Sequence, residues 1–202
     1  MVVNRYSFAL NYYDINHFFS NSNIKTDPMY APEEVLQIGK EVDDYICYQK
    51  KPTLPLAIAA CKTYNKSNAK VFIDSLRKQL RFQHEYYRYW NIYSDIWIPV
   101  KSKLDVELKG KFVMDIKTTN ATDRDQFMKT VNKLEYDQQL AVYAQQARVN
   151  AAYILVVSKK SDYCELLIFN SEQLAAGYQK FIDKIAALTL TKEELLNYGK
   201  GA

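Results

Sequence analysis

The sequence has few of the residues that interrupt or cross-link a chain, with 5 glycines, 5 prolines and 3 cysteines among 202 residues. So little glycine and proline excludes collagen-like and low-complexity chains, and 48% hydrophobic with 25% charged residues is typical of a globular protein. The cysteines are odd in number and lack metal-ligand spacing, so they predict free thiols in a reducing compartment. They are Cys47, Cys61 and Cys164.

Long hydrophobic runs are also missing. No stretch reaches the roughly 20 apolar residues that a membrane-spanning helix needs. Residues 1–19 carry Asn, Arg, Asp and His where a secretory signal would be apolar. We therefore expect a cytoplasmic protein with no membrane segment. A chain of this length suits one domain, spanning residues 1–202 with its core at about 33–190.

Charge is unevenly distributed, although the formal net charge of +4 excludes little by itself. Residues 27–44 are predominantly acidic, and residues 61–103 are predominantly basic. Such an asymmetry is typical of a protein that binds a polyanion together with cations. Surface charge that only keeps the protein soluble is the commoner explanation.

Hydrophobic periodicity predicts helices and strands in an alternating order. Helical spacing and start signals predict helices over 32–49, 67–80, 131–149 and 171–188, the second with Val71, Leu76 and Leu80 facing inward. A period of two predicts two strands between 82 and 108 that meet near 93–95. Further strands are expected over 111–119, 151–160 and 163–170. The strand at 151–160 is apolar throughout and therefore central. Residues 108–112 are typical of a tight hairpin and 120–127 of a polar loop. The order predicts an α/β fold.

Acidic residues lie within two of these strands, where an unpaired charge is costly to bury. If the hairpin turn centres on Lys109 and Gly110, Asp105 and Asp115 lie nearly opposite each other, with Cβ atoms about 5 Å apart. A divalent cation between the two carboxylates would remove their repulsion, and an all-oxygen site suits Mg²⁺ or Mn²⁺. Lys117 projects from the same face as Asp115 and could orient a water or stabilise charge on a phosphate. The alternative is a surface ion pair among exposed residues.

The motifs around these residues give the chain a family resemblance. Asp105, the run "DIKTT" at 115–119 and the run "QLAVY" at 139–143 follow one another in order. The set resembles the PD-(D/E)XK nuclease superfamily, within it the branch of RecB-type nuclease domains, lambda exonuclease and exonuclease VIII. The resemblance covers roughly residues 33–170. It implies a restriction-endonuclease-like core, with a central mixed β-sheet flanked by helices.

The resemblance also implies roles for particular residues. Asp105 and Asp115 match the metal-binding acids, with the backbone carbonyl of Ile116 as a further ligand, and Lys117 matches the lysine that assists the nucleophile. Gln139 and Tyr143 match the Q-x-x-x-Y motif. Because they are four apart on one helix face, they could hydrogen-bond a phosphate or brace Lys117. The alternative for Tyr143 is a core tyrosine with a satisfied hydroxyl.

The upstream helix departs from the family pattern. "IGKEVDDYI" resembles the G-x-x-x-H helix, with Gly39 matching and Asp43 in the place of the histidine. Asp43 can coordinate a metal through oxygen, but Glu41 and Asp44 are alternatives, and so is a solvated helix face. The chain also lacks the four cysteines that hold an iron–sulfur cluster in some relatives, so we predict no cluster.

A basic and aromatic run precedes the two acidic strands. It predicts contacts to phosphates from Arg77, Lys78, Arg81 and Arg88, and stacking of its rings on unpaired bases. Strand aromatics more often pack a sheet than touch nucleic acid. Thr118 and Thr119, which follow the D-x-K element, complete the predicted nucleic-acid contacts.

Two functions from different classes follow. The first is a Mg²⁺- or Mn²⁺-dependent DNA nuclease, an exonuclease by resemblance, that hydrolyses phosphodiester bonds with a metal-activated water. The second is a non-catalytic nucleic-acid-binding or assembly protein that retains the fold, for which the missing histidine is the main argument. DNA is the expected partner, and a homo-oligomer or a protein of phage-type recombination or replication is left open. Cleavage from an end or within the chain, and DNA or RNA as substrate, also stay open.

Overall fold

The computed structural model describes residues 10–11, 32–93 and 96–187. Its helices are α2 (Glu33–Tyr48), α3 (Pro55–Asn65), α4 (Asn68–Leu76), α5 (Arg124–Leu134), α6 (Tyr136–Ala147) and α7 (Ser171–Ala187). Its strands are β1 (Leu10–Asn11), β2 (Arg81–Tyr93), β3 (Ile96–Leu108), β4 (Phe112–Thr119), β5 (Ala152–Ser158) and β6 (Cys164–Phe169). In this part of the chain no helix is long and apolar enough to cross a membrane.

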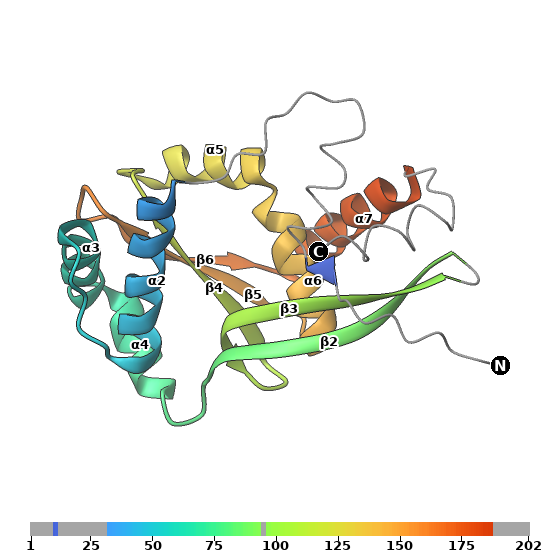
Figure 1. Cartoon of the computed structure of the whole chain (residues 1–202), viewed down its shortest axis with the longest axis horizontal. Helices are drawn as coiled ribbons and strands as arrows, with labels where there is room; N and C mark the ends of the chain where they lie inside the picture. Colours follow the sequence, from blue (N-terminus) through green and yellow to red (C-terminus); the bar gives the residue numbers. More distant parts are fainter. Residues whose placement is uncertain (1–9, 12–31, 94–95, 188–202) are drawn as a thin grey trace.

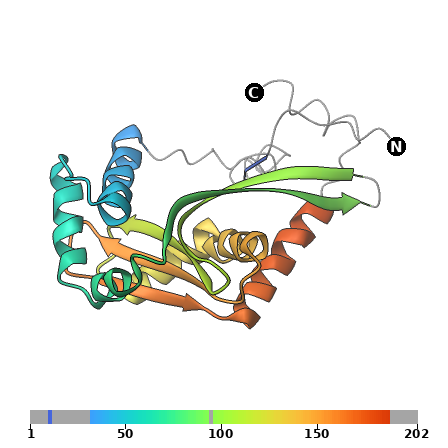
Figure 2. The same ribbon diagram turned by 90° about the horizontal axis from the view of Figure 1, so that it is seen from below.

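The strands form one mixed sheet with helices on both faces. The order is β1, β3, β4, β5, β6, with β2 also paired to β3. The pairs β1–β3 and β4–β5 are parallel, and the other pairs are antiparallel. One group of helices, α2 to α4, gathers at one end of the molecule, and α5 to α7 lie on the other side of the sheet (Figures 1 and 2). The fold is therefore α/β, with a mixed sheet flanked by helices, as predicted.

Strand β5 is an interior strand of the sheet, paired with β4 on one side and with β6 on the other. Ile154 is buried in the core formed with α5, α6 and α7, whereas the next residue, Leu155, is buried in the core formed with α2, α3 and α4. A strand covered on both faces needs apolar residues at every position. The prediction that the apolar strand is central is confirmed.

The ladder between β3 and β4 is short. A turn at Gly110, with φ of 69°, joins the two strands, and the pairing runs only from Leu108↔Phe112 to Val106↔Met114. Strand β3 continues well beyond this ladder as half of a long hairpin with β2. In Figure 1, β3 and β4 separate beyond the ladder and run in different directions. The sheet therefore has a fork between β3 and β4, with Asp105 and Asp115 at its start.

One helix is missing from the sequence-based prediction, and another begins earlier than predicted. Helix α3 was not predicted, although Pro55 at its first position is a known start signal. Helix α5 lies partly where a polar loop was expected, and it begins where the Asp123 side chain accepts a hydrogen bond from the Gln126 N–H. The helix predicted over 131–149 is in fact the end of α5 followed by α6, because Glu135 between them has a left-handed backbone with φ of 55°.

Helix α4 differs from the prediction in length and in orientation. It begins after the Ser67 cap, as expected, but ends at Leu76 instead of continuing to residue 80. Val71 was expected to face inward and is 69% exposed. Ala69 and Ile73, four residues apart, face the core instead, which leaves Val71 on the outer side of the helix.

Candidate active site

Asp105 lies at the point where β3 leaves β4. Its Oδ2 accepts a hydrogen bond from the backbone N–H of Ile116 at 2.8 Å, so the side chain satisfies a β4 donor beyond the last β3–β4 residue pair. Its Oδ1 accepts a hydrogen bond from Gln83 Nε2 at 2.9 Å. An ionised carboxylate has about four lone-pair sites. Asp105 is therefore held in place by two donors and can still accept a further ligand.

Asp115 and Lys117 form a buried ion pair on β4. Lys117 Nζ lies 2.5 Å from Asp115 Oδ2, and the two side chains are 14% and 6% exposed. The same ammonium lies 4.6 Å from the centre of the Tyr136 ring, at the start of α6. The exposed surface ion pair, which was the alternative for this set, is wrong because the pair is buried.

Two of the three candidate acids on α2 have other partners. Glu41 accepts hydrogen bonds from the backbone N–H groups of Thr53 at 2.8 Å and Leu54 at 2.9 Å, which fixes the chain ahead of α3. Asp44 forms an ion pair with Lys50 at 3.0 Å. Both carboxylates are therefore used to stabilise the structure around α2.

Asp43, the third acid, interacts with the carboxylates of the fork. Burial, together with the charges of Asp105 and Asp115, raises the pKa of Asp43 to about 9. Burial and the charge of Asp115 raise the pKa of Asp105 to about 7, although the Ile116 N–H and the Lys117 ammonium oppose the rise. Carboxyl groups that disfavour each other's ionisation in this way are stabilised by an added positive charge. The electrostatics of the fork therefore favour a cation.

The donor set fits a hydrated divalent cation. Its available ligands are oxygens, which suits Mg²⁺ or Mn²⁺ better than softer metals. Across residues 10–11, 32–93 and 96–187, no three His, Cys, Asp or Glu side chains come together as a group that could hold a metal ion. Mg²⁺ does not need one, because it commonly uses one or two carboxylates and keeps several waters. Asp115 contacts Lys117 through Oδ2, which leaves its other carboxylate oxygen, Oδ1, as a suitable first ligand.

Gln139 and Tyr143 lie on one face of α6, as their spacing predicts, but inside the protein. They are 2% and 6% exposed, and Gln139 Nε2 donates a hydrogen bond to the Tyr143 hydroxyl at 2.8 Å. Tyr143 belongs to the core between the sheet and α5 to α7. The pair therefore fits a bracing role within α6 better than direct contact with a phosphate.

Thr118 and Thr119 are half-buried at the end of β4. The Thr119 hydroxyl accepts a hydrogen bond from the Ala121 N–H at 3.0 Å, so it is used in the turn that follows. A Cβ on Gly39 of α2 would lie 3.7 Å from the Thr118 hydroxyl. The helix that carries Asp43 therefore crosses β4 at Thr118, close to the fork.

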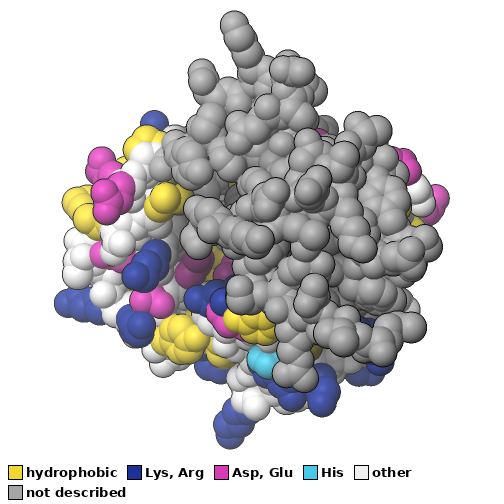
Figure 3. All heavy atoms as spheres, turned by 45° about the vertical axis from the view of Figure 1, so that its right-hand side comes forward, with side chains coloured by type: hydrophobic (Ala, Val, Ile, Leu, Met, Phe, Trp, Pro, Cys, Tyr) yellow, Lys and Arg dark blue, Asp and Glu magenta, His cyan; other side chains and the backbone are white. Residues whose placement is uncertain are grey.

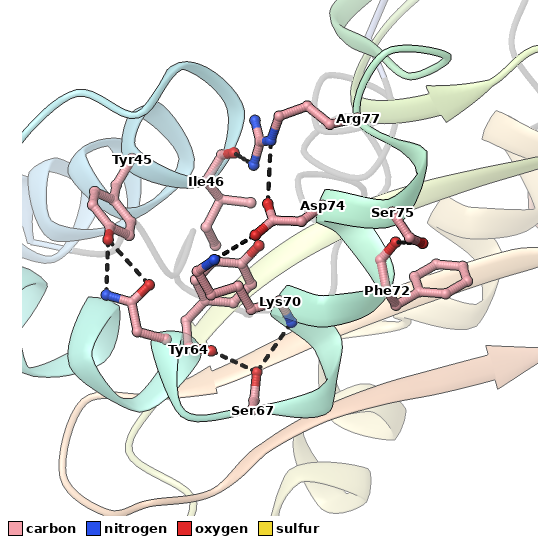
Figure 4. A network of polar contacts seen from close by, with 10 residues as sticks. Tyr45, Ile46, Tyr64, Ser67, Lys70, Phe72, Asp74, Ser75 and Arg77 are labelled. Atoms are coloured by element: carbon pink, nitrogen blue, oxygen red, sulfur yellow. Dashed lines mark hydrogen bonds and ion pairs between the residues drawn. The ribbon is translucent and has the colours of Figure 1, made fainter.

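Arg77 has a role that differs from the predicted phosphate contact. Its terminal nitrogens donate hydrogen bonds to the carbonyls of Cys47 at 3.2 Å and Ile46 at 2.9 Å, the last turn of α2. Its Nε donates to Asp74 at 3.3 Å, and Figure 4 shows Arg77 between Ile46 and Asp74. Unpaired carbonyls at a helix C-terminus are stabilised by a cation. Arg77 therefore holds the end of the helix that carries Asp43.

We expect Arg77→Ala to lower the free energy of unfolding by about 1–3 kcal/mol, because hydrogen bonds from a charged donor contribute on this order. Urea unfolding measures the change. Lys78→Ala is the matched control, because the adjacent Lys78 side chain is exposed and should leave stability unchanged. Unchanged stability of Arg77→Ala together with weaker DNA binding would restore the phosphate-binding role.

The other predicted phosphate ligands are more accessible. Lys78 is exposed and Arg88 is half-buried, whereas Arg81 is 43% exposed and lies 3.9 Å from the buried carboxylate of Glu107. Among the described side chains that are visible in Figure 3, lysines and arginines are scattered among acidic ones. Of the aromatic run, Tyr87 is 60% exposed, whereas the side chains of Tyr89 and Trp90 lie outside the described residues.

Two residues of this site were not identified from the sequence. Gln83 lies in a strand pattern without any local signal that its amide reaches Asp105. Tyr136 lies three residues before the Q-x-x-x-Y motif, and only the tertiary structure places its ring against Lys117. Both contacts join segments that are far apart along the chain.

Comparison with known proteins supports the fold. No family model and no curated protein matches this chain. A solved structure of a proposed exonuclease from Eubacterium rectale is similar with a TM-score of 0.56 and 17% identity, over 85% of this chain and 70% of that one. A phage-related exonuclease from Haemophilus somnus has a TM-score of 0.42 and 12% identity, over 89% and 96% of the two chains. The first likeness shows a shared fold, and the second is too distant to add to it.

Proposed function

We propose that this protein is a Mg²⁺-dependent DNA nuclease of the PD-(D/E)XK type that hydrolyses phosphodiester bonds as an exonuclease. The observation that carries the proposal is the fork between β3 and β4, where Asp105 lies beside the buried pair of Asp115 and Lys117. Titratable groups with strongly raised pKa values gather at functional sites. The shared fold with a proposed exonuclease supports the same class.

Each residue of the fork has a role in this proposal. Asp105 and Asp115 would hold Mg²⁺, with the Ile116 carbonyl and Asp43 as further oxygen donors. The bound ion would lower the pKa of a water and offset phosphate charge. The ammonium of Lys117, held between the Asp115 carboxylate and the Tyr136 ring, is available to orient the attacking water or to stabilise charge on the phosphate. Gln139 and Tyr143 would keep α6, and with it Tyr136, in position.

The competing function is a binding or assembly protein that has lost catalysis. The absence of the family histidine favours it, but Asp43 supplies an oxygen donor in that place. The Asp115–Lys117 pair argues against it, because side chains that are 6% and 14% exposed contribute little to a binding surface. A buried ion pair is also weak as a source of stability. Catalysis gives this pair a use that binding alone does not.

End-labelled linear DNA and closed circular DNA, each with Mg²⁺ or with a chelator, test the proposal. We expect Mg²⁺-dependent shortening of the linear duplex, an intact circle, and no reaction in chelator. Cleavage of the circular DNA would support a nuclease but show that it is an endonuclease and not an exonuclease. A protein that cleaves no DNA or RNA with Mg²⁺ or Mn²⁺ would instead be the binding or assembly protein.

A further inference from the structure

Gln83 has an unusual backbone for the middle of a strand. Its φ is 51°, which is in the left-handed region that residues other than glycine rarely adopt. The hairpin pairs regularly on both sides of it, with Phe82 opposite Val106 and His84 opposite Leu104. The register is the same before and after Gln83, so no residue is inserted or lost there. The distortion is therefore local to Gln83 and the residue opposite it.

The residue opposite Gln83 is Asp105. By the register of the flanking pairs the two residues face each other, but they are absent from the regular ladder. Gln83 Nε2 instead donates a hydrogen bond to Asp105 Oδ1 at 2.9 Å. The other oxygen, Oδ2, accepts the Ile116 N–H at 2.8 Å from the far side of the fork. The carboxylate is therefore held from two strands, β2 and β4, while its own backbone belongs to β3.

Strained backbone at a non-glycine residue persists where the surrounding structure enforces it, and such residues cluster at functional sites. A glycine at position 83 would remove the strain, but it would also remove the amide that reaches Asp105. Donors to a metal-binding carboxylate fix its orientation, and losing one typically weakens metal binding by about 10–100-fold. A strained glutamine at this position is explained if its amide orients a metal-binding carboxylate.

We propose that Gln83 is a positioning residue that orients the Asp105 carboxylate for a divalent cation, and that its left-handed backbone is what brings the amide to that carboxylate. The proposal rests on the function proposed above, because it assumes that Asp105 holds a metal ion. It goes beyond the motif residues, since Gln83 belongs to none of them. It also assigns a task to the irregularity of the β2–β3 hairpin.

Two substitutions separate positioning from a purely structural role. Gln83→Gly removes both the amide and the backbone strain, whereas Gln83→Ala removes the amide and keeps a Cβ at positive φ. We expect the melting temperature of the metal-free Gly variant to equal or exceed that of wild type, and that of the Ala variant to be lower than that of the Gly variant. Both variants should bind Mn²⁺ at least about tenfold more weakly, measured by calorimetry or by the electron paramagnetic resonance of the free ion.

The outcomes are distinguishable. Weaker Mn²⁺ binding in both variants, together with unequal stabilities, supports the positioning role. If the loss of Mn²⁺ affinity came from a structural defect, it would instead be larger in the variant with the lower melting temperature. Wild-type Mn²⁺ affinity in the Gly variant would overturn the role of Gln83 and leave the nuclease proposal intact. If the wild-type protein itself binds no Mn²⁺, the metal site of the proposed function fails, and the role of Gln83 fails with it.

Discussion

Lys117→Ala should cleave DNA at least about 100-fold more slowly than wild type while binding it nearly as well, since this is a loss typical of removing one positioned catalytic group. The ammonium of Lys117 lies between Asp115 and Tyr136, only 14% exposed, so it can add little to the attraction of distant phosphates. Its charge matters most as charge develops on the reacting phosphate, which is a transition-state effect. Single-turnover cleavage and equilibrium binding on the same linear duplex measure the two quantities.

Lys78→Ala is the matched control for Lys117→Ala, because Lys78 is exposed and lies outside the fork. A lysine that neutralises phosphate acts equally in the ground state and in the transition state, so its loss should weaken affinity and flatten the salt dependence of binding. Cleavage at saturating protein should change little. A Lys117→Ala protein that cleaves at the wild-type rate would remove this residue from the chemistry.

Asp43→Asn should have opposite effects on stability and on metal binding. The pKa of Asp43 is raised from 3.8 to about 9 by burial and by the charges of Asp105 and Asp115. Above about pH 4 the unfolded chain releases this proton while the folded protein keeps it, so the free energy of unfolding falls as the pH rises towards 9. Asparagine cannot ionise and removes this loss.

The expected stabilisation of metal-free Asp43→Asn at pH 8 is at least about 1 kcal/mol, since one pKa unit corresponds to about 1.4 kcal/mol. In a protein of this size that is a rise of about 2–4 °C in melting temperature. The gain should disappear near pH 4. Mg²⁺ binding should weaken by at least about tenfold, because a neutral amide replaces an anionic carboxylate ligand. Thermal unfolding from pH 4 to pH 9 and calorimetric titration with Mg²⁺ measure both effects.

Asp44→Asn is the control, because its carboxylate forms an ion pair with Lys50 on the outer side of α2. Such pairs are worth about 0–1 kcal/mol, so this variant should keep its metal affinity and most of its stability. If Asp44→Asn loses Mg²⁺ binding and Asp43→Asn does not, the alignment of α2 with the family helix is wrong by one residue.

Much of the fold could be predicted from local patterns. The strands between 81 and 108 follow from their period of two and the strand at 152–158 from its apolar run, and the helix that begins after Ser67 follows from its cap. The start of helix α5 was missed because residues 120–127 are mostly polar, and the break at Glu135 was missed because nothing local requires a left-handed backbone there. Val71 was misplaced because its helix is too short for the spacing to identify one face.

The sequence by itself determined which residues could carry the chemistry. The spacing of Asp105, Asp115 and Lys117 around a turn at Gly110 places two carboxylates and an ammonium on adjacent strands, since strand geometry is regular over so few residues. Strand geometry over so few residues depends only on the local sequence, so the relative positions of these side chains can be predicted without the rest of the fold.

Tertiary structure alone decided how those residues are held and which of their neighbours take part. It assigned Glu41 to the loop before α3, and Arg77 to the end of α2. It also brought Gln83 to Asp105 and Tyr136 to Lys117. Each of these contacts joins side chains from segments that are distant in the sequence, and local periodicity does not predict such contacts. Packing decides them, because burial and hydrogen bonding are satisfied across the whole fold at once.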